Sequence, residues 1–225
     1  MIEDSIAVVM AGGDSRRMGQ DKANLQLGER TLLQSVAATL QPLFSEVFVS
    51  VRQPRSGIAL PQICDDPAHT GPLAGLAAAL EHAATPWVFV VACDMPFITA
   101  AVIEHLAGLR VKSPTSTSTR PCPSAPGSEG EEGSSPDKGR LGGVVFQAVV
   151  PVVGGHPQPL AAFYAKSCLH EVQACLHGNG KRSFRALLDK LQVCYVSEEQ
   201  LQAIDPQLRS FFDLDTPQDF QAAQK

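Results

Sequence analysis

Short apolar runs alternate with polar and glycine-containing segments along the chain. The apolar runs are rich in β-branched and aromatic residues, and they occupy Ile6–Met10, Val47–Val51, Trp87–Cys93, Val144–Val153 and Val193–Val196. Such residues suit a pleated sheet. The runs are continuous rather than alternating, which is typical of strands that are buried on both faces. The pattern therefore predicts a largely parallel sheet.

Between these runs, apolar residues recur at helical spacing. The spacing predicts amphipathic helices over 32–40 and 73–80, and further helices over 99–108, 160–177 and 183–191. Strands that alternate with helices in this way are characteristic of an α/β fold. We therefore expect a sheet with helices on both faces.

One segment, 112–140, breaks this alternation. Ser, Thr, Pro and Gly supply 19 of its 29 positions, and its apolar residues are Cys122 and Ala125. Such a composition does not build a core. Because neither flank alone completes an α/β sheet, we interpret the segment as a disordered insertion within a single domain, residues 1–225. Its many Ser and Thr leave a phosphorylated regulatory loop as an alternative.

Composition and charge narrow the function classes. Hydrophobic residues make up 44% and charged residues 18%, which is ordinary for a globular protein. The formal net charge of −5 has the wrong sign for a protein that coats nucleic acid or an anionic membrane. The acidic start MIEDS lacks the features of a signal peptide, so we expect a cytoplasmic protein. The six cysteines show neither CxxC nor zinc-finger spacing, and we expect reduced thiols.

The strongest chemical signal directly follows the first apolar run. Residues 10–22 (MAGGDSRRMGQDK) contain glycines together with Arg16, Arg17 and Lys22. Ligands of open parallel sheets bind beyond the carboxyl ends of the strands, where glycines let backbone N–H groups approach phosphate oxygens. The segment thus predicts an anion pocket, although a plain turn with solvated charges would have a similar composition.

Two common nucleotide motifs do not fit this segment. A Walker loop requires lysine directly after its last glycine, whereas Gln20 follows Gly19, and GxGxxG is absent. The sequence therefore disfavours a P-loop ATPase and a classical dinucleotide-binding protein.

A series of motifs in a fixed order carries a resemblance to a known family. The motifs are AGGDSRRMGQDK at 11–22, GPLAGL at 71–76, CDMPF at 93–97, PQPLAAFY at 157–164 and FDLDTPQDF at 212–220. In order and spacing they resemble those of the molybdenum cofactor guanylyltransferases, a family of molybdopterin nucleotidyltransferases. The resemblance covers nearly the whole chain except 112–140.

The resemblance implies both a fold and a reaction. The fold would be a three-layer, mostly parallel Rossmann-like sheet of the nucleotide-diphospho-sugar transferase type. The reaction would be Mg²⁺-dependent transfer of GMP from GTP to the terminal phosphate of molybdopterin, with release of pyrophosphate. The family also leads us to expect a monomer that contacts molybdoenzyme maturation proteins.

The resemblance, together with the chemistry of the side chains, also implies site residues. Basic groups would neutralise the triphosphate as pyrophosphate departs. A carboxylate at the end of a buried strand would suit Mg²⁺. The predicted catalytic residues are Lys22, Arg17 and Asp94, and the predicted metal ligands are Asp94 and Asp215. The predicted nucleotide-binding residues are Met10, Ala11, Gly12, Gly13, Arg16, Lys22, Asp65, Gly71, Pro72, Leu73 and Asp94.

Several of these assignments have alternatives. Asp65 and Asp66 both precede the GPLAG motif, and we rank Asp65 first as the ligand of ribose or base. Asp94 and Asp215 could instead be helix caps. Asp213 and Asp215 stand where the family has asparagines, and because two carboxylates bind a cation more strongly than two amides, we predict that Asp215 joins Asp94 as a second metal ligand.

Other functions also remain open. One alternative is a cytidylyltransferase of the same pathway, or a nucleotidyltransferase of sugar or alcohol phosphates. The AGG at 11–13 resembles the guanylyl form, since the cytidylyl relatives more often have AAG. A different class is a non-enzymatic adaptor that uses 112–140 to bind a partner in molybdoenzyme maturation.

Overall fold

The fold was examined in a computed structural model of the chain, which describes residues 1–12, 22–110, 145–178, 182–214 and 216–223. The predicted insertion at 112–140 lies outside these residues. The same holds for Gly13, Arg16, Arg17 and Asp215.

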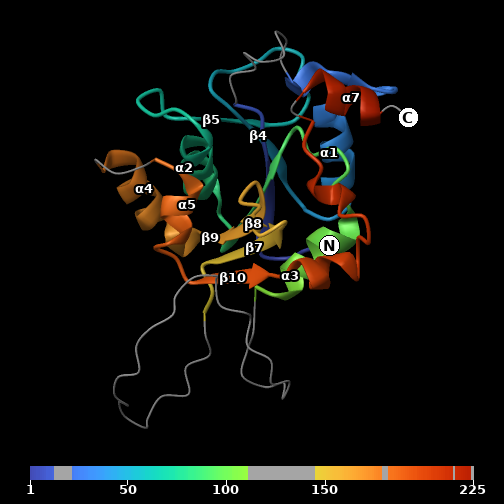
Figure 1. Cartoon of the computed structure of the whole chain (residues 1–225). Coiled ribbons are helices and arrows are strands. Elements are labelled where there is room, and N and C mark those ends of the chain that lie inside the picture. Colours follow the sequence, from blue (N-terminus) through green and yellow to red (C-terminus); the bar gives the residue numbers. More distant parts are fainter. Residues whose placement is uncertain (13–21, 111–144, 179–181, 215, 224–225) are drawn as a thin grey trace.

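In the described part of the chain, an eight-stranded sheet has the order β10-β7-β9-β6-β1-β4-β5, with β8 paired to β7 (Figure 1). Its strands are β1 (Ser5–Met10), β4 (Val47–Val51), β5 (Gln62–Cys64), β6 (Trp87–Ala92), β7 (Ala148–Val153), β8 (His156–Pro157), β9 (Ala161–Ala165) and β10 (Val193–Val196). The neighbours β6, β1, β4 and β5 are mutually parallel, and β10 is parallel to β7. Only β8 and β9 pair antiparallel within this sheet. A separate hairpin joins β2 (Gln26–Leu27) and β3 (Arg30–Thr31).

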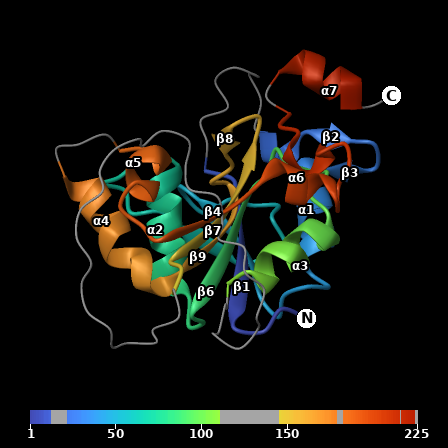
Figure 2. The same cartoon turned by 60° about the horizontal axis from the view of Figure 1, so that its bottom comes forward.

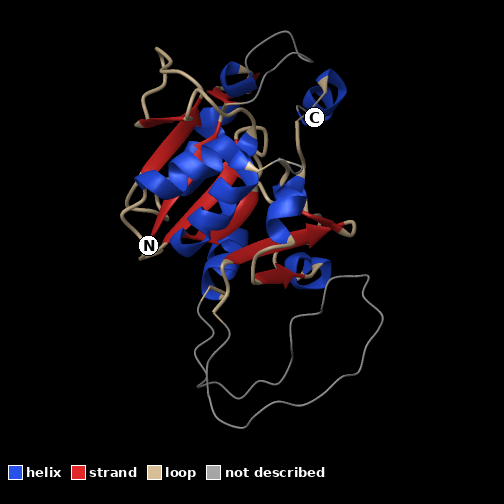
Figure 3. Cartoon of the chain, turned by 90° about the vertical axis from the view of Figure 1, so that its left-hand side faces the viewer, coloured by secondary structure: helices blue, strands red, loops and turns tan. Residues whose placement is uncertain are grey.

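Helices cover both faces of the sheet (Figures 2 and 3). The α-helices are α1 (Leu32–Leu40), α2 (Pro72–His82), α3 (Ala100–Gly108), α4 (Leu169–His177), α5 (Phe184–Leu188), α6 (Glu198–Gln202) and α7 (Pro217–Ala223). The 3-10 helices are η1 (Lys22–Asn24), η2 (Lys166–Cys168) and η3 (Arg209–Phe211). Helices α1, α3 and α6 lie on one face, and α2, α4 and α5 lie on the other. The predicted three-layer, mostly parallel α/β architecture is confirmed.

The two faces of the sheet build two hydrophobic cores, and β1 contributes to both. Ala7 and Val9 lie in the core beneath α1 and α3, whereas Ile6, Val8 and Met10 lie in the core beneath α2. All residues of β1 are buried. Because successive side chains of a strand point to opposite faces, a strand between two helix layers must be apolar throughout. This explains why the strand runs of the sequence are continuous.

The predicted helix over 160–177 was wrong in its first part. Ala161–Ala165 form β9, which pairs antiparallel with β6 and places Phe163 opposite Phe89. A helix begins only at Leu169, after η2. All five residues of β9 are buried, so the segment shows no polar face. An apolar run of this length does not distinguish a buried strand from a buried helix by periodicity.

Other element boundaries also differ from the prediction. The strand expected from Val144 begins at Ala148, and the helix expected over 183–191 ends at Leu188. The short elements β5 and α6 were not predicted. Each has three to five residues, which is too short for a periodic pattern to be distinctive.

Among the described residues, no helix is both long and apolar enough to cross a membrane.

Candidate functional site

The carboxyl ends of four parallel strands meet at one edge of the sheet. Backbone hydrogen bonds continue beyond the strands: Ala11 N–H donates to the carbonyl of Ser50 at 3.0 Å, and Asp65 N–H donates to that of Val51 at 3.0 Å. Cys93 N–H donates to the carbonyl of Met10 at 3.2 Å. The segments after β1, β4, β5 and β6 are thereby brought together, as expected for the ligand-binding edge of an open α/β sheet.

Asp65 is the buried carboxylate of this edge. Its exposed fraction is 7%, and the Ser50 hydroxyl donates to its Oδ1 at 3.0 Å. Burial raises the pKa of Asp65, while the Ser50 hydrogen bond and the nearby Arg52 guanidinium act to lower it. A buried carboxylate held in this way is well suited to accept hydrogen bonds from a ligand.

Asp66 has a different role from its neighbour. Its side chain is exposed, and it accepts a hydrogen bond from Ala68 N–H at 2.9 Å. It also lies 3.3 Å from Nδ1 of His69. The hydrogen bond from Ala68 is the main cause that lowers the pKa of Asp66. Asp66 therefore shapes the turn, and the geometry favours Asp65 as the ligand-facing member of the pair.

The GPLAG motif starts α2 at this edge. Gly71 has φ of 96°, a conformation that L side chains rarely adopt, and Pro72 follows in the first turn of the helix. The N-cap residue Gly71 has no side chain, and among the described residues no side-chain cap is seen at this helix end. Pro72 has no N–H, and Ala74 N–H donates to the carbonyl of Gly71 at 3.0 Å, so Leu73 is the residue of this first turn whose N–H could donate to an anion. That Gly71, Pro72 and Leu73 contact a nucleotide stays a prediction.

Gly75 lets α2 approach the sheet closely. A Cβ atom at this position would lie 2.3 Å from Cε of Met10, 2.6 Å from Oγ of Ser50 and 3.4 Å from Oδ1 of Asp65. The first two distances are too short for real contacts with a methyl group, whereas 3.4 Å is an ordinary van der Waals contact. Gly75 was not among the predicted site residues, although it lies within the GPLAG motif. The motif thus also serves packing beneath the site.

Asp94 follows β6 at the same edge and is partly buried. Its carbonyl accepts a hydrogen bond from Leu214 N–H at 2.9 Å, which brings the C-terminal FDLDTP segment beside it. Thr99 caps α3, because its hydroxyl accepts from Val102 N–H at 3.4 Å. The cap role that was weighed for Asp94 is therefore filled by another residue.

Asp94 offers one carboxylate at this edge, which suits it to be a single protein ligand of Mg²⁺. This ion takes oxygen ligands, and it is commonly held by one or two carboxylates together with substrate phosphates and water. No cluster of three or more His, Cys, Asp or Glu suited to a metal occurs among the described residues. A site at Asp94 would therefore depend on substrate oxygens. The predicted second ligand, Asp215, lies outside the described residues.

Of the three basic residues predicted for the anion pocket, Lys22 lies within the described residues. Lys22 begins η1, which packs against α1. Gly13, Arg16 and Arg17 lie outside the described residues, so their contacts stay predictions.

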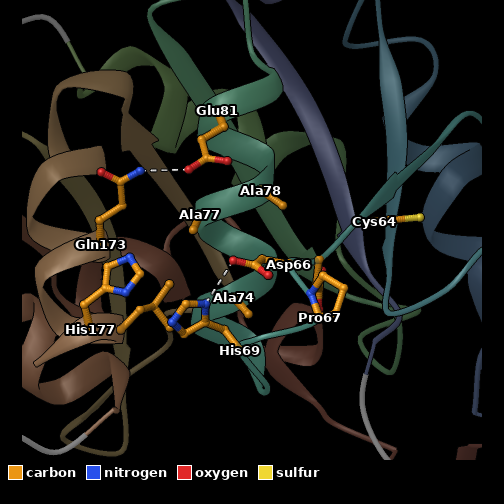
Figure 4. A pocket seen from close by; sticks show the side chains of 12 residues that line it. Cys64, Asp66, Pro67, His69, Ala74, Ala77, Ala78, Glu81, Gln173 and His177 are labelled. Carbon is orange, nitrogen blue, oxygen red and sulfur yellow. Dashed lines mark hydrogen bonds and ion pairs between the residues drawn. The ribbon is translucent and has the colours of Figure 1, made fainter. Parts of the chain in front are cut away.

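A cavity of about 360 Å³ adjoins Asp65 on the outer side of α2 (Figure 4). His69 and His177 meet there in an edge contact with ring centroids 4.7 Å apart. Gln173 of α4 donates to Glu81 of α2 at 2.8 Å across the cavity. Sequence reasoning missed this cavity, because its walls come from segments about a hundred residues apart.

With this geometry in hand, the chain was compared with known proteins. Residues 7–193 match the family described as MobA-like NTP transferase domain. The chain belongs to this family. It is a nucleotidyltransferase, which confirms the enzyme class expected from the motifs.

Named relatives extend the match over almost the whole chain. A "Probable molybdenum cofactor guanylyltransferase" of Pelotomaculum thermopropionicum is 34% identical over 94% of this chain and 88% of its own length. A "Molybdenum cofactor guanylyltransferase" of Desulfosudis oleivorans is 28% identical, with coverage of 96% and 93%. The resemblance stated from the motifs is confirmed.

Solved structures agree with the sequence comparison. The molybdopterin-guanine dinucleotide biosynthesis protein A of Archaeoglobus fulgidus has a TM-score of 0.73 and 26% identity, and the match covers 97% of this chain and 96% of that protein. The 2-C-methyl-D-erythritol 4-phosphate cytidylyltransferase of Thermus thermophilus has a TM-score of 0.57 and 19% identity, with coverage of 97% and 96%. The second likeness shows the nucleotidyltransferase fold alone.

Proposed function

We propose that this chain transfers GMP from GTP to the terminal phosphate of molybdopterin in an Mg²⁺-dependent reaction. The products would be the molybdopterin guanine dinucleotide cofactor and pyrophosphate. The observation that carries the proposal is that Asp65, Asp94 and the amino end of α2 all lie at the carboxyl edge of the parallel strands. It gains support from the family and from relatives that are named molybdenum cofactor guanylyltransferases.

The nucleotide would be held by a hydrogen-bond acceptor on one side and by hydrogen-bond donors on the other. The carboxylate of Asp65 can accept hydrogen bonds from guanine N–H groups or from ribose hydroxyls. The N–H groups of Gly12 and Leu73 can donate to phosphate oxygens. Gly12 suits this role because a Cβ there would lie 3.4 Å from Oδ2 of Asp65 and would occupy part of the space beside that carboxylate through which a nucleotide reaches the Gly12 N–H.

In the reaction, an oxygen of the terminal phosphate of molybdopterin attacks the α-phosphorus of GTP. The bond from that phosphorus to the bridging oxygen breaks, and pyrophosphate leaves. Asp94 would hold Mg²⁺, which supplies positive charge to the triphosphate when bound. Lys22 and either Arg16 or Arg17 would stabilise the charge that gathers on the leaving group. Positioning and charge stabilisation carry phosphoryl-type transfer, so no nucleophilic side chain is needed.

The proposal is tested by calorimetric titration of the purified protein with GTP, CTP, ATP and UTP, each with and without Mg²⁺. Magnesium-dependent binding that is selective for GTP is expected. Preference for CTP would instead indicate the cytidylyltransferase alternative. Failure to bind any nucleotide would contradict the proposal and favour the adaptor, for which deletion of 113–139 should abolish partner binding. A turnover assay with molybdopterin then tests the acceptor.

The two adjacent aspartates provide a matched pair of variants. Asp65→Asn is expected to weaken GTP binding by at least about 10-fold, the scale of a hydrogen bond to a charged group. Asp66→Asn should leave the dissociation constant within about twofold, because its side chain is directed to Ala68 and His69. Calorimetry with GTP measures both. An equal loss in the two variants would contradict the assignment of Asp65.

A further inference from the structure

Ser50 is a polar residue in a fully buried position. It lies in β4, where the other residues are apolar, and its exposed fraction is 0%. It is opposite Met10 in the β1–β4 register and opposite Ile63 in the β4–β5 register. A buried hydroxyl is costly unless it makes a hydrogen bond. Here the Ser50 hydroxyl donates to Oδ1 of Asp65 at 3.0 Å.

The space for this hydrogen bond depends on Gly75. A methyl group on Gly75 would lie 2.6 Å from the Ser50 hydroxyl oxygen, so any larger residue there would displace it. The same methyl would lie 3.4 Å from Oδ1 of Asp65. Helix α2 thus covers Ser50 and one oxygen of Asp65 from above. The other oxygen, Oδ2, lies toward Gly12 at the edge of the sheet.

We propose that Ser50 is a positioning residue of the nucleotide site: its hydroxyl holds Oδ1 of Asp65 and so directs Oδ2 to the nucleotide beside Gly12. The proposal rests on the proposed function, because it assigns Asp65 to GTP. Ser50 itself does not need to touch the nucleotide. Its hydroxyl holds the Asp65 carboxylate in one orientation, which lowers the entropic cost of ordering that side chain when GTP binds.

The same hydrogen bond influences the charge of Asp65. Burial raises the pKa of Asp65, and the bond from Ser50 together with Arg52 acts against that rise. Among the described residues, Arg52, directly after β4, is the charged side chain that acts on Asp65. The neighbours from β1 and α2 are Met10, Gly12 and Gly75, which do not titrate, and Asp66 accepts a hydrogen bond from Ala68 N–H. His69, His177 and Glu81 line the cavity that adjoins Asp65, and because they are unchanged in every variant, the comparison with the wild type isolates the effect of Ser50. Loss of the Ser50 hydroxyl would raise the pKa of Asp65 further.

The direction of the pH effect follows from this. GTP needs the ionised form of Asp65, so its affinity falls when the pH falls through the pKa of that group. In Ser50→Ala this decline is expected at higher pH than in the wild type. We expect GTP to bind about 10-fold more weakly at neutral pH, and the midpoint of the decline to move up by about one pH unit.

The experiment measures the dissociation constant of GTP from pH 5 to 8 for the wild type, Ser50→Ala, Asp65→Asn and Ser197→Ala. Ser197 is a matched control, because its hydroxyl caps α6 and makes no contact with Asp65. Ser197→Ala should lose stability without a change in the pH profile. Gly75→Ala supplies a second variant, which should displace the Ser50 hydroxyl and shift the profile in the same direction.

Two outcomes separate the inference from the proposed function. If Asp65→Asn weakens GTP binding but the pH profile of Ser50→Ala coincides with that of the wild type, the role of Ser50 is overturned and the nucleotide site stands. If Asp65→Asn binds GTP as the wild type does, the assignment of Asp65 to the nucleotide fails, and the role of Ser50 fails with it. A loss of stability alone in Ser50→Ala also overturns the inference.

Discussion

Asp94→Asn is expected to lower the rate of GMP transfer by about 100-fold or more, the scale of losing one essential electrostatic contact in an active site. Asparagine has nearly the same shape, so the backbone bond from Leu214 N–H to the carbonyl of residue 94 can persist. What is lost is the negative charge that would hold Mg²⁺ at the end of β6. The variant should therefore remain folded and bind GTP with a weakened dependence on Mg²⁺.

The measurement is the rate of pyrophosphate release with GTP and molybdopterin over a range of Mg²⁺ concentrations. Asp189→Asn is a suitable control, because Asp189 is an exposed residue at the end of α5. It should retain wild-type turnover. Wild-type turnover in Asp94→Asn at low Mg²⁺ would refute the metal assignment.

The central part of the fold follows from local sequence patterns. Strand β6 and all but the first residue of β1 form continuous apolar runs, β4 is apolar except for Ser50, and the helices that follow β1 and β5 show clear amphipathic spacing. A connection between parallel strands is usually a helix, which limits the arrangements that these patterns allow. The predicted layers were therefore correct even though several boundaries were not.

The antiparallel strand β9 shows where local patterns fail. Its sequence AAFYA contains three alanines, which favour helices, and it lies between β6 and β7 in the sheet with one face in each hydrophobic core. Its conformation is set by pairing with β6, whose residues lie more than sixty positions earlier in the chain. Only tertiary contacts decide between strand and helix in such a segment.

In the candidate site too, local patterns identify segments better than side-chain directions. The motifs indicated Asp65 and Asp94 and ranked Asp65 before Asp66, and the structure shows how these two adjacent side chains differ. One of these side chains turns inward to Ser50, and the other turns outward to Ala68. The partner of Asp65 lies fifteen residues earlier in a different strand, so no local pattern reveals it. Spacing along the chain identifies which segment reaches the site, but the direction of a side chain is fixed by packing.

Lys22→Ala is expected to lower the rate of GMP transfer by about 100-fold, because an ammonium group that stabilises charge on departing pyrophosphate is removed. Binding of GTP should weaken less than turnover, since the charge on the leaving group is greatest in the transition state. Single-turnover rates and dissociation constants for GTP separate the two effects. Lys190→Ala, which removes an exposed lysine just after α5, should change neither quantity. If Lys22→Ala weakened GTP binding while the single-turnover rate at saturating GTP stayed unchanged, Lys22 would contribute only to ground-state binding, and the stabilisation of pyrophosphate would have to come from Arg16 or Arg17.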